Sequence, residues 1–95
     1  MIIPIGVGSQ EFIITALVDN NCKHTKNCTH SINGKVLGKA KWIGITKPDE
    51  LGSCYLFMCY ADGFLSDSVF ESLEEAKEQA EWEYEGISIN WQNAI

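Results

Sequence analysis

The sequence predicts an α+β fold in which an antiparallel sheet of about four to six strands carries one C-terminal amphipathic helix, about residues 72–85, packed on one face. Short β-branched runs separated by turn signals predict the sheet. A capped start and a glycine stop predict the helix. The length of 95 residues, 45% of them apolar, suits a single domain over residues 1–95 with one core.

The strands are expected where apolar and β-branched residues cluster. Pro4 makes the first cluster an edge strand or an irregular lead-in. Asn33-Gly34 is a tight-turn signal, and Asp62-Gly63 is a second one between two strands of a hairpin. The expected strand segments are residues 1–7, 11–18, 35–46 (one long strand or two short ones), 53–60 and 64–70.

The helix is the strongest local prediction. Ser72 is placed as its N-cap with Glu75 three residues later, the capping-box arrangement, and Gly86 follows as the stop. Steps of about 100° per residue put a mostly apolar stripe towards the core and glutamates on the other side. The stripe is Leu73, Ala76, Ala80 and Tyr84, and the opposite side holds Glu74, Glu75, Glu78, Glu81 and Glu85.

Charge is distributed unevenly along the chain. The net charge is −6; residues 71–95 hold seven glutamates and one lysine, whereas residues 1–70 hold six acids and six lysines. Those six lysines all lie between Asp19 and Asp49, which predicts a dipolar molecule with an acidic end. The chain has no arginine, the residue best suited to forked phosphate and base contacts. This composition argues against nucleic acid as a partner and favours a basic protein.

Other classes are excluded by simple patterns. No apolar run reaches the roughly 18 residues that a membrane span needs. The apolar start lacks a basic leading region, so we expect no signal peptide, no membrane partner and a cytoplasmic location. Cysteines in that compartment are thiols, and those at positions 54 and 59 lie in an apolar run typical of buried small side chains.

One cluster has the residue types of a metal site. Cys22, His24, Cys28 and His30 would converge if residues 25–27 formed a hairpin loop, because residues two apart on a strand share a face. Two thiolates and two imidazoles suit tetrahedral zinc. The spacing differs from that of common zinc modules, so a polar loop or hairpin without metal is the favoured interpretation and no cofactor is expected.

Catalysis is not expected. The same cysteines and histidines are crowded into nine residues and offer no separate walls for a cleft. The paired glutamates of the helix lie on a solvated face, where no cleft excludes water. Gly6-Val7-Gly8-Ser9 lacks the rest of a phosphate-loop motif. We therefore expect a binding protein and not an enzyme.

Trp82 falls on the outward side of the helix, among Glu75, Glu78 and Gln79. Two interpretations are open. The C-terminal tail folds back and covers the indole, with Trp91 nearby, or the indole stays exposed in an acidic surround, as at a binding hot spot.

A resemblance covers about a third of the chain. Residues 60–91 resemble the C-terminal half of small bacterial immunity proteins of toxin–immunity pairs, including contact-dependent growth inhibition systems. The matching positions are Asp67, Phe70, residues 72–76, residues 80–84 and Trp91. The aromatic at position 82 in that pattern favours the covered interpretation of Trp82.

The resemblance implies an antitoxin that binds and neutralises a cognate toxin domain stoichiometrically. A basic nuclease fits best, since its substrate is polyanionic. We expect the partner-binding residues to be Glu74, Glu75, Glu78, Glu81 and Glu85, extended by Asp67 and Asp62. The alternatives are a zinc-binding structural or regulatory module and a generic interaction domain.

Overall fold

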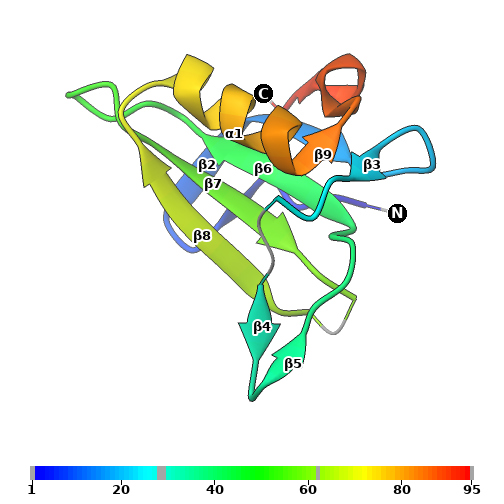
Figure 1. Ribbon diagram of the computed structural model, residues 1–95. Helices are drawn as coiled ribbons and strands as arrows, with labels where there is room; N and C mark the ends of the chain where they lie inside the picture. Colours follow the sequence, from blue (N-terminus) through cyan, green and yellow to red (C-terminus); the bar gives the residue numbers. More distant parts are fainter. Residues whose placement is uncertain (1, 28–29, 62, 95) are drawn as a thin grey trace.

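The computed structural model describes residues 2–27, 30–61 and 63–94. Its centre is a curled antiparallel sheet in the order β1-β2-β6-β7-β8, with β10 also pairing with β2 (Figure 1). The strands are β1 (Gly6–Val7), β2 (Gln10–Leu17), β6 (Trp42–Thr46), β7 (Cys54–Cys59), β8 (Leu65–Phe70) and β10 (Gln92–Asn93). The predicted α+β fold, an antiparallel sheet with a single helix near the C-terminus, is confirmed.

Helix α1 (Leu73–Glu83) begins as predicted. The Ser72 hydroxyl accepts a hydrogen bond from the backbone N–H of Glu75 at 3.1 Å. The Glu75 carboxylate reaches back one residue further than in a capping box and accepts from the N–H of Glu71 at 3.2 Å. The helix ends two residues earlier than predicted, because β9 (Tyr84–Glu85) leaves it to pair with β3 (Lys23–His24). Gly86 then adopts a positive φ of 94°, which glycine tolerates.

The core lies between the helix and one face of the sheet. Ala76 and Ala80 are fully buried, and their small size lets the helix approach the sheet closely. The sheet contributes alternate residues of its strands, as the period of two requires. These include Ile14 and Ala16, Ile43 and Ile45, and Cys54, Leu56 and Met58. Tyr84 is also buried, and its hydroxyl accepts a hydrogen bond from the N–H of Ala40 at 2.8 Å.

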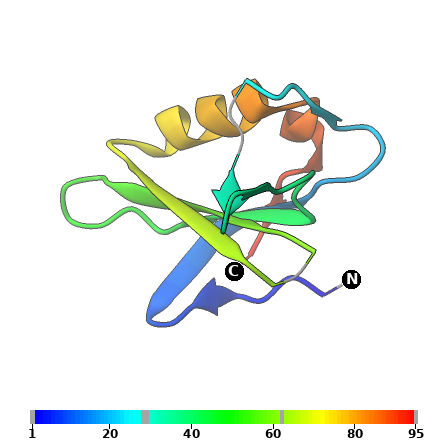
Figure 2. The same cartoon turned by 60° about the horizontal axis from the view of Figure 1, so that its bottom comes forward.

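The opposite face of the sheet holds an aromatic cluster. Phe12 packs against Trp42 and Phe57, with ring centroids 5.8 and 6.0 Å away. Gly44 is needed beneath Phe12, since a Cβ there would lie 2.6 Å from the ring. Figure 2 shows α1 packed over one face of the curled sheet, with β1 at the edge of the sheet far from the helix.

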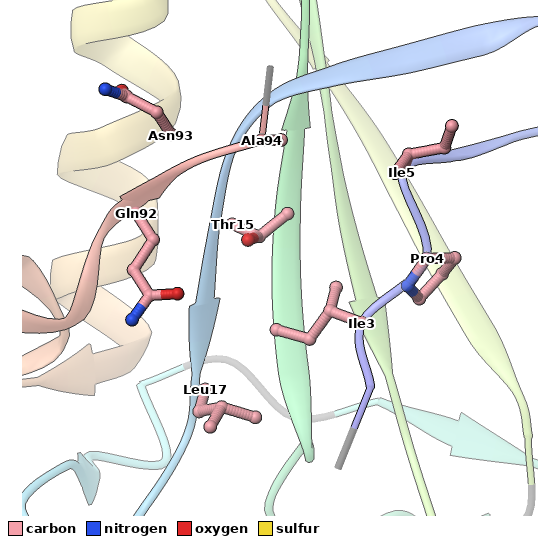
Figure 3. Close-up of a pocket in the computed structure, with 8 residues that line it drawn as sticks. All are labelled: Ile3, Pro4, Ile5, Thr15, Leu17, Gln92, Asn93 and Ala94. Atoms are coloured by element: carbon pink, nitrogen blue, oxygen red, sulfur yellow. The ribbon is translucent and has the colours of Figure 1, made fainter.

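Two short strands share the outer edge of β2. Strand β1 pairs with its first residues, Val7 opposite Gln10, and β10 pairs further along, Asn93 opposite Ile14. A hollow of about 260 Å³ lies between the two terminal segments (Figure 3). Its walls include Ile3, Pro4 and Ile5 on one side and residues 92–94 on the other, and none of its lining residues titrates.

The predicted turn at Asn33-Gly34 is confirmed. Both residues have positive φ, 52° and 79°, and they connect β4 (Ser31–Ile32) to β5 (Lys35–Val36). Residues 35–46 were expected to form one long strand or two short ones, and they form two short strands, β5 and β6. The zinc hypothesis supposed a hairpin loop over residues 25–27, but in the described residues His24 pairs with Tyr84 across the sequence and Ser31 pairs with Val36. Within the described residues, no helix is long and apolar enough to cross a bilayer.

Candidate functional site

The outward surface of α1 is the strongest candidate for a binding site. Glu74, Glu75 and Glu78 are exposed on the helix, and Glu85 is exposed in β9 just beyond it. The exposure of Glu74, Glu75 and Glu78 follows from the helical period, because Ala76, which faces the sheet, lies one or two residues from each of them, about 100° or 200° around the helix axis. These four residues are called the outward glutamates below. Asp67 is exposed on β8, whereas Asp62 lies outside the described residues.

Glu81 was predicted to belong to the same set, but its carboxylate serves this chain. One oxygen accepts from the N–H of Gly86 at 2.7 Å and the other from the N–H of Ser88 at 3.2 Å. The side chain is half-buried and closes the turn after the helix. Glu81 is thus tied to the fold and offers less to a partner than the outward glutamates.

Glu83 is the residue that sequence reasoning missed. It is only 3% exposed, and its two carboxylate oxygens bind separate groups. One lies 3.3 Å from Nε2 of His30, and the other accepts from the amide of Gln79 at 2.8 Å. The available signal was its angular position, close to Ala76 on the helix. This carboxylate ties the segment before β4 to the helix.

The outward glutamates form no ion pair with this chain's lysines in the described part of the structure. The two ion pairs found there join His30 to Glu83 and Lys47 to Glu11. Two lysines do lie close in the fold, since Lys77 is three residues from Glu74 and Lys23 lies opposite Glu85 in the β3–β9 ladder. The face of α1 that meets solvent therefore carries a net negative charge, although it is not free of nearby positive groups.

Trp82 lies in this surface and is 50% exposed. The interpretation in which the C-terminal tail covers it is wrong. The tail forms the short helix η1 (Ile87–Asn90) and strand β10, which pairs with β2, and Trp91 packs at the margin of the core. The indole instead borders a shallow groove of about 400 Å³, whose lining residues are Phe70, Glu75, Glu78, Gln79 and Trp82.

The backbone at Trp82 is held by a segment distant in sequence. Its carbonyl accepts hydrogen bonds from the Thr25 hydroxyl at 2.7 Å and from the Asn27 amide at 3.0 Å. The carbonyl of Glu83 accepts from the backbone N–H of Thr25 at 3.0 Å. These bonds satisfy carbonyls that a helix end leaves without intrahelical partners. They fix the last turn while leaving the indole itself half open to solvent.

The candidate zinc ligands have separate surroundings. The thiol of Cys22 is buried near the Asn90 amide, 3.3 Å away, while the His24 ring stacks on Tyr84 at 4.9 Å. His30 faces Glu83, and Cys28 lies outside the described residues. Among the described residues, no three metal-ligating side chains gather at one point. Burial raises the pKa of Cys22, which disfavours the thiolate that zinc would need.

Cys54 has a similar character. Its side chain is fully buried in the core, and burial raises the pKa of its thiol. A protonated buried thiol acts as a small apolar side chain. Its position agrees with the structural role expected from the apolar run.

Comparisons of the chain with models of known protein families, with curated proteins and with solved structures returned no significant match. A functional assignment therefore depends on the chemistry of this surface.

Proposed function

We propose that this protein is a cytoplasmic immunity protein that binds a basic toxin domain, best represented by a nuclease, and neutralises it stoichiometrically. The observation that carries the proposal is the acidic face of α1, whose exposed glutamates form no ion pair among the described residues, with the half-exposed Trp82 in it. The resemblance of residues 60–91 to immunity proteins supports the same partner class.

The outward glutamates act first on encounter. A surface of one charge sign speeds association with an oppositely charged protein, by about tenfold to a thousandfold at low salt. Nucleases need a cationic groove to hold nucleic acid, so the acidic face is complementary in charge to their substrate-binding groove. An inhibitor seated there excludes the substrate without performing chemistry itself.

Trp82 contributes binding affinity, which exposed charges alone provide only weakly. Exposed charge pairs add little net affinity in water, whereas a buried aromatic residue commonly dominates an interface. Its backbone is already fixed by Thr25 and Asn27, so binding costs little further ordering. The acidic face would set the rate of encounter, and the aromatic residue would slow dissociation.

The test is protection of bacterial cells against a toxin domain encoded beside this chain. We expect Glu74→Lys/Glu78→Lys to lower the association rate with that toxin about tenfold or more and to reduce protection. Glu11→Lys/Glu50→Lys is the matched control: it changes the net charge equally at exposed positions off the helix, and we expect an effect below about twofold. Circular dichroism checks that each variant is folded.

Reversal of all four outward glutamates should abolish protection. Full protection by that variant would refute the acidic-face mechanism. Binding to unrelated basic proteins with no protection against any neighbouring toxin would instead favour a generic interaction domain. Equal losses from the helix pair and the control pair would mean that only net charge matters.

A further inference from the structure

The groove beside Trp82 has both an apolar surface and an acidic wall. It lies where the outward side of α1 meets the end of β8, with a volume of about 400 Å³. Trp82 and Phe70 contribute aromatic surface, and Glu75 and Glu78 contribute carboxylates. Apolar surface flanked by charge of a single sign fits a ligand group that is itself flat, hydrophobic on its faces and cationic.

The electrostatic surroundings favour a cation at this place. The groove extends along the helix from Glu75, in its first turn, to Trp82, in its last turn. No lysine lines the groove. A positive group entering it would meet attraction from the two glutamates.

The hydrogen-bonding groups of the groove are mostly acceptors. Glu75 uses one carboxylate oxygen for the N–H of Glu71, at 3.2 Å, which leaves the other. Gln79 donates its amide N–H to Glu83 at 2.8 Å, so its amide oxygen remains as an acceptor. A partner group with several N–H donors would satisfy these oxygens.

Arginine meets all of these requirements and lysine only some. The guanidinium is planar and stacks on an indole face, while its edge donates several N–H bonds to carboxylates. An ammonium has the charge but no flat face, and it loses more hydration on binding. We infer that the groove formed by Phe70, Glu75, Glu78, Gln79 and Trp82 receives an arginine side chain of the cationic partner. This inference rests on the proposed function for the partner's basic character.

The test uses a model ligand, acetylated hexa-arginine amide, with hexa-lysine of the same length and charge for comparison. Binding is followed by two-dimensional NMR, where the Trp82 indole N–H reports the groove directly. We expect this resonance to shift with hexa-arginine and to shift less with hexa-lysine. Trp82→Ala should weaken hexa-arginine binding about three- to tenfold, whereas Trp82→Phe, which keeps a ring, should retain most of it.

Two charge-matched pairs separate the groove from the rest of the acidic face. Glu75→Gln/Glu78→Gln removes two carboxylates that line the groove, and Glu74→Gln/Glu85→Gln removes two that do not. We expect the first pair to weaken hexa-arginine binding at least threefold more than the second. All four positions are exposed, so these variants should fold even if Trp82→Ala does not.

The outcomes distinguish this inference from the proposed function. Equal losses from the two pairs, or an unshifted Trp82 resonance, would overturn the arginine site and leave the acidic face intact as a toxin-binding surface. Loss of cell protection on reversing the outward glutamates, with no arginine preference, would lead to the same conclusion. Self-association of the protein in sedimentation experiments, abolished by Trp82→Ala, would show that a second copy occupies the groove and would also overturn it.

Discussion

Helix α1 begins with exposed glutamates, Glu74, Glu75 and Glu78, of which only Glu75 has a recorded bond to the same chain, from the N–H of Glu71. It ends with two less exposed ones, Glu81 and Glu83, whose carboxylates each bind two groups of the same chain. The two regions have similar composition and differ in what surrounds them. Residues 25–27, His30 and the tail after Gly86 contact the last turn, and nothing comparable among the described residues covers the first turns. A glutamate count therefore overstates the surface available to a partner, because part of the charge stabilises the fold.

The largest effect should come from the buried end of the helix. Glu83→Ala removes an acceptor from both His30 and Gln79 and opens a small cavity under the helix. We expect a loss of about 2–3 kcal/mol in the free energy of unfolding, measured by urea denaturation. Glu78→Ala, an exposed change in the same helix, serves as the control and should stay within about 0.5 kcal/mol. Similar losses of unfolding free energy from both variants would contradict the proposed difference between the solvent-facing start and the buried end of the helix.

Glu81→Ala should have the second-largest effect. It removes hydrogen bonds to the N–H groups of Gly86 and Ser88 and loosens the turn after the helix. We expect a loss of about 1–2 kcal/mol in the free energy of unfolding, with Glu81→Gln losing less because it keeps one oxygen acceptor. Glu85→Ala, exposed and four residues further on, is the control. If Glu81→Ala left the free energy of unfolding unchanged, Glu81 would have to be grouped with the outward glutamates.

Thr25→Val tests the hydrogen bonds that hold the last turn of α1, by changing the donor residue outside the helix. Valine has nearly the same shape but cannot donate to the carbonyls of Trp82 and Glu83, 2.7 and 3.2 Å from the threonine hydroxyl. We expect a loss of about 1 kcal/mol and faster amide hydrogen exchange in the last turn of α1 than in its first turns. Uniformly changed exchange along the whole helix would argue against a local anchor.

The smallest effect concerns an acid outside the helix. Asp19 accepts a hydrogen bond from the backbone N–H of Asn21 at 2.9 Å, and this bond, followed by contact with Asn90, lowers its pKa below the ordinary 3.8. A lowered folded-state pKa contributes stability above about pH 3.8, and that contribution is lost as the pH falls through the folded value. An NMR titration should place the Asp19 midpoint below 3.8, and Asn21→Pro, which removes the donor, should raise it. A midpoint at or above 3.8 in the unaltered protein would contradict the bond.

Much of the fold could be predicted because its signals are local. Ser72 and Asn33-Gly34 carry their conformations in a few neighbouring residues, and the β-branched and apolar runs in residues 11–18 and 53–60 indicate strands of useful length. The β3–β9 and β2–β10 ladders could not be foreseen, because strands of two residues have no periodicity. Their partners lie about 60 and 80 residues away, so only the assembled fold brings them together.

The candidate site was predicted in outline and corrected in detail. The helical period correctly placed Glu74, Glu75 and Glu78 outside and Ala76 and Ala80 inside. It could not decide the fates of Glu81, Glu83 and Trp82, since these depend on where the loop before β4 and the C-terminal tail pack. Once the tail joins β2, it is no longer available to cover Trp82.

The pairing of Asn93 with Ile14 also has a consequence for biosynthesis. Strand β2 emerges early from the ribosome, yet half of its outer edge has no partner until Asn93 has been translated and released from the exit tunnel. During that interval an apolar strand with unsatisfied backbone groups is open to pairing with another chain. Nascent protein should therefore be vulnerable to aggregation in the interval between the emergence of β2 and that of Asn93, and slow translation of the codons between them would prolong that exposure.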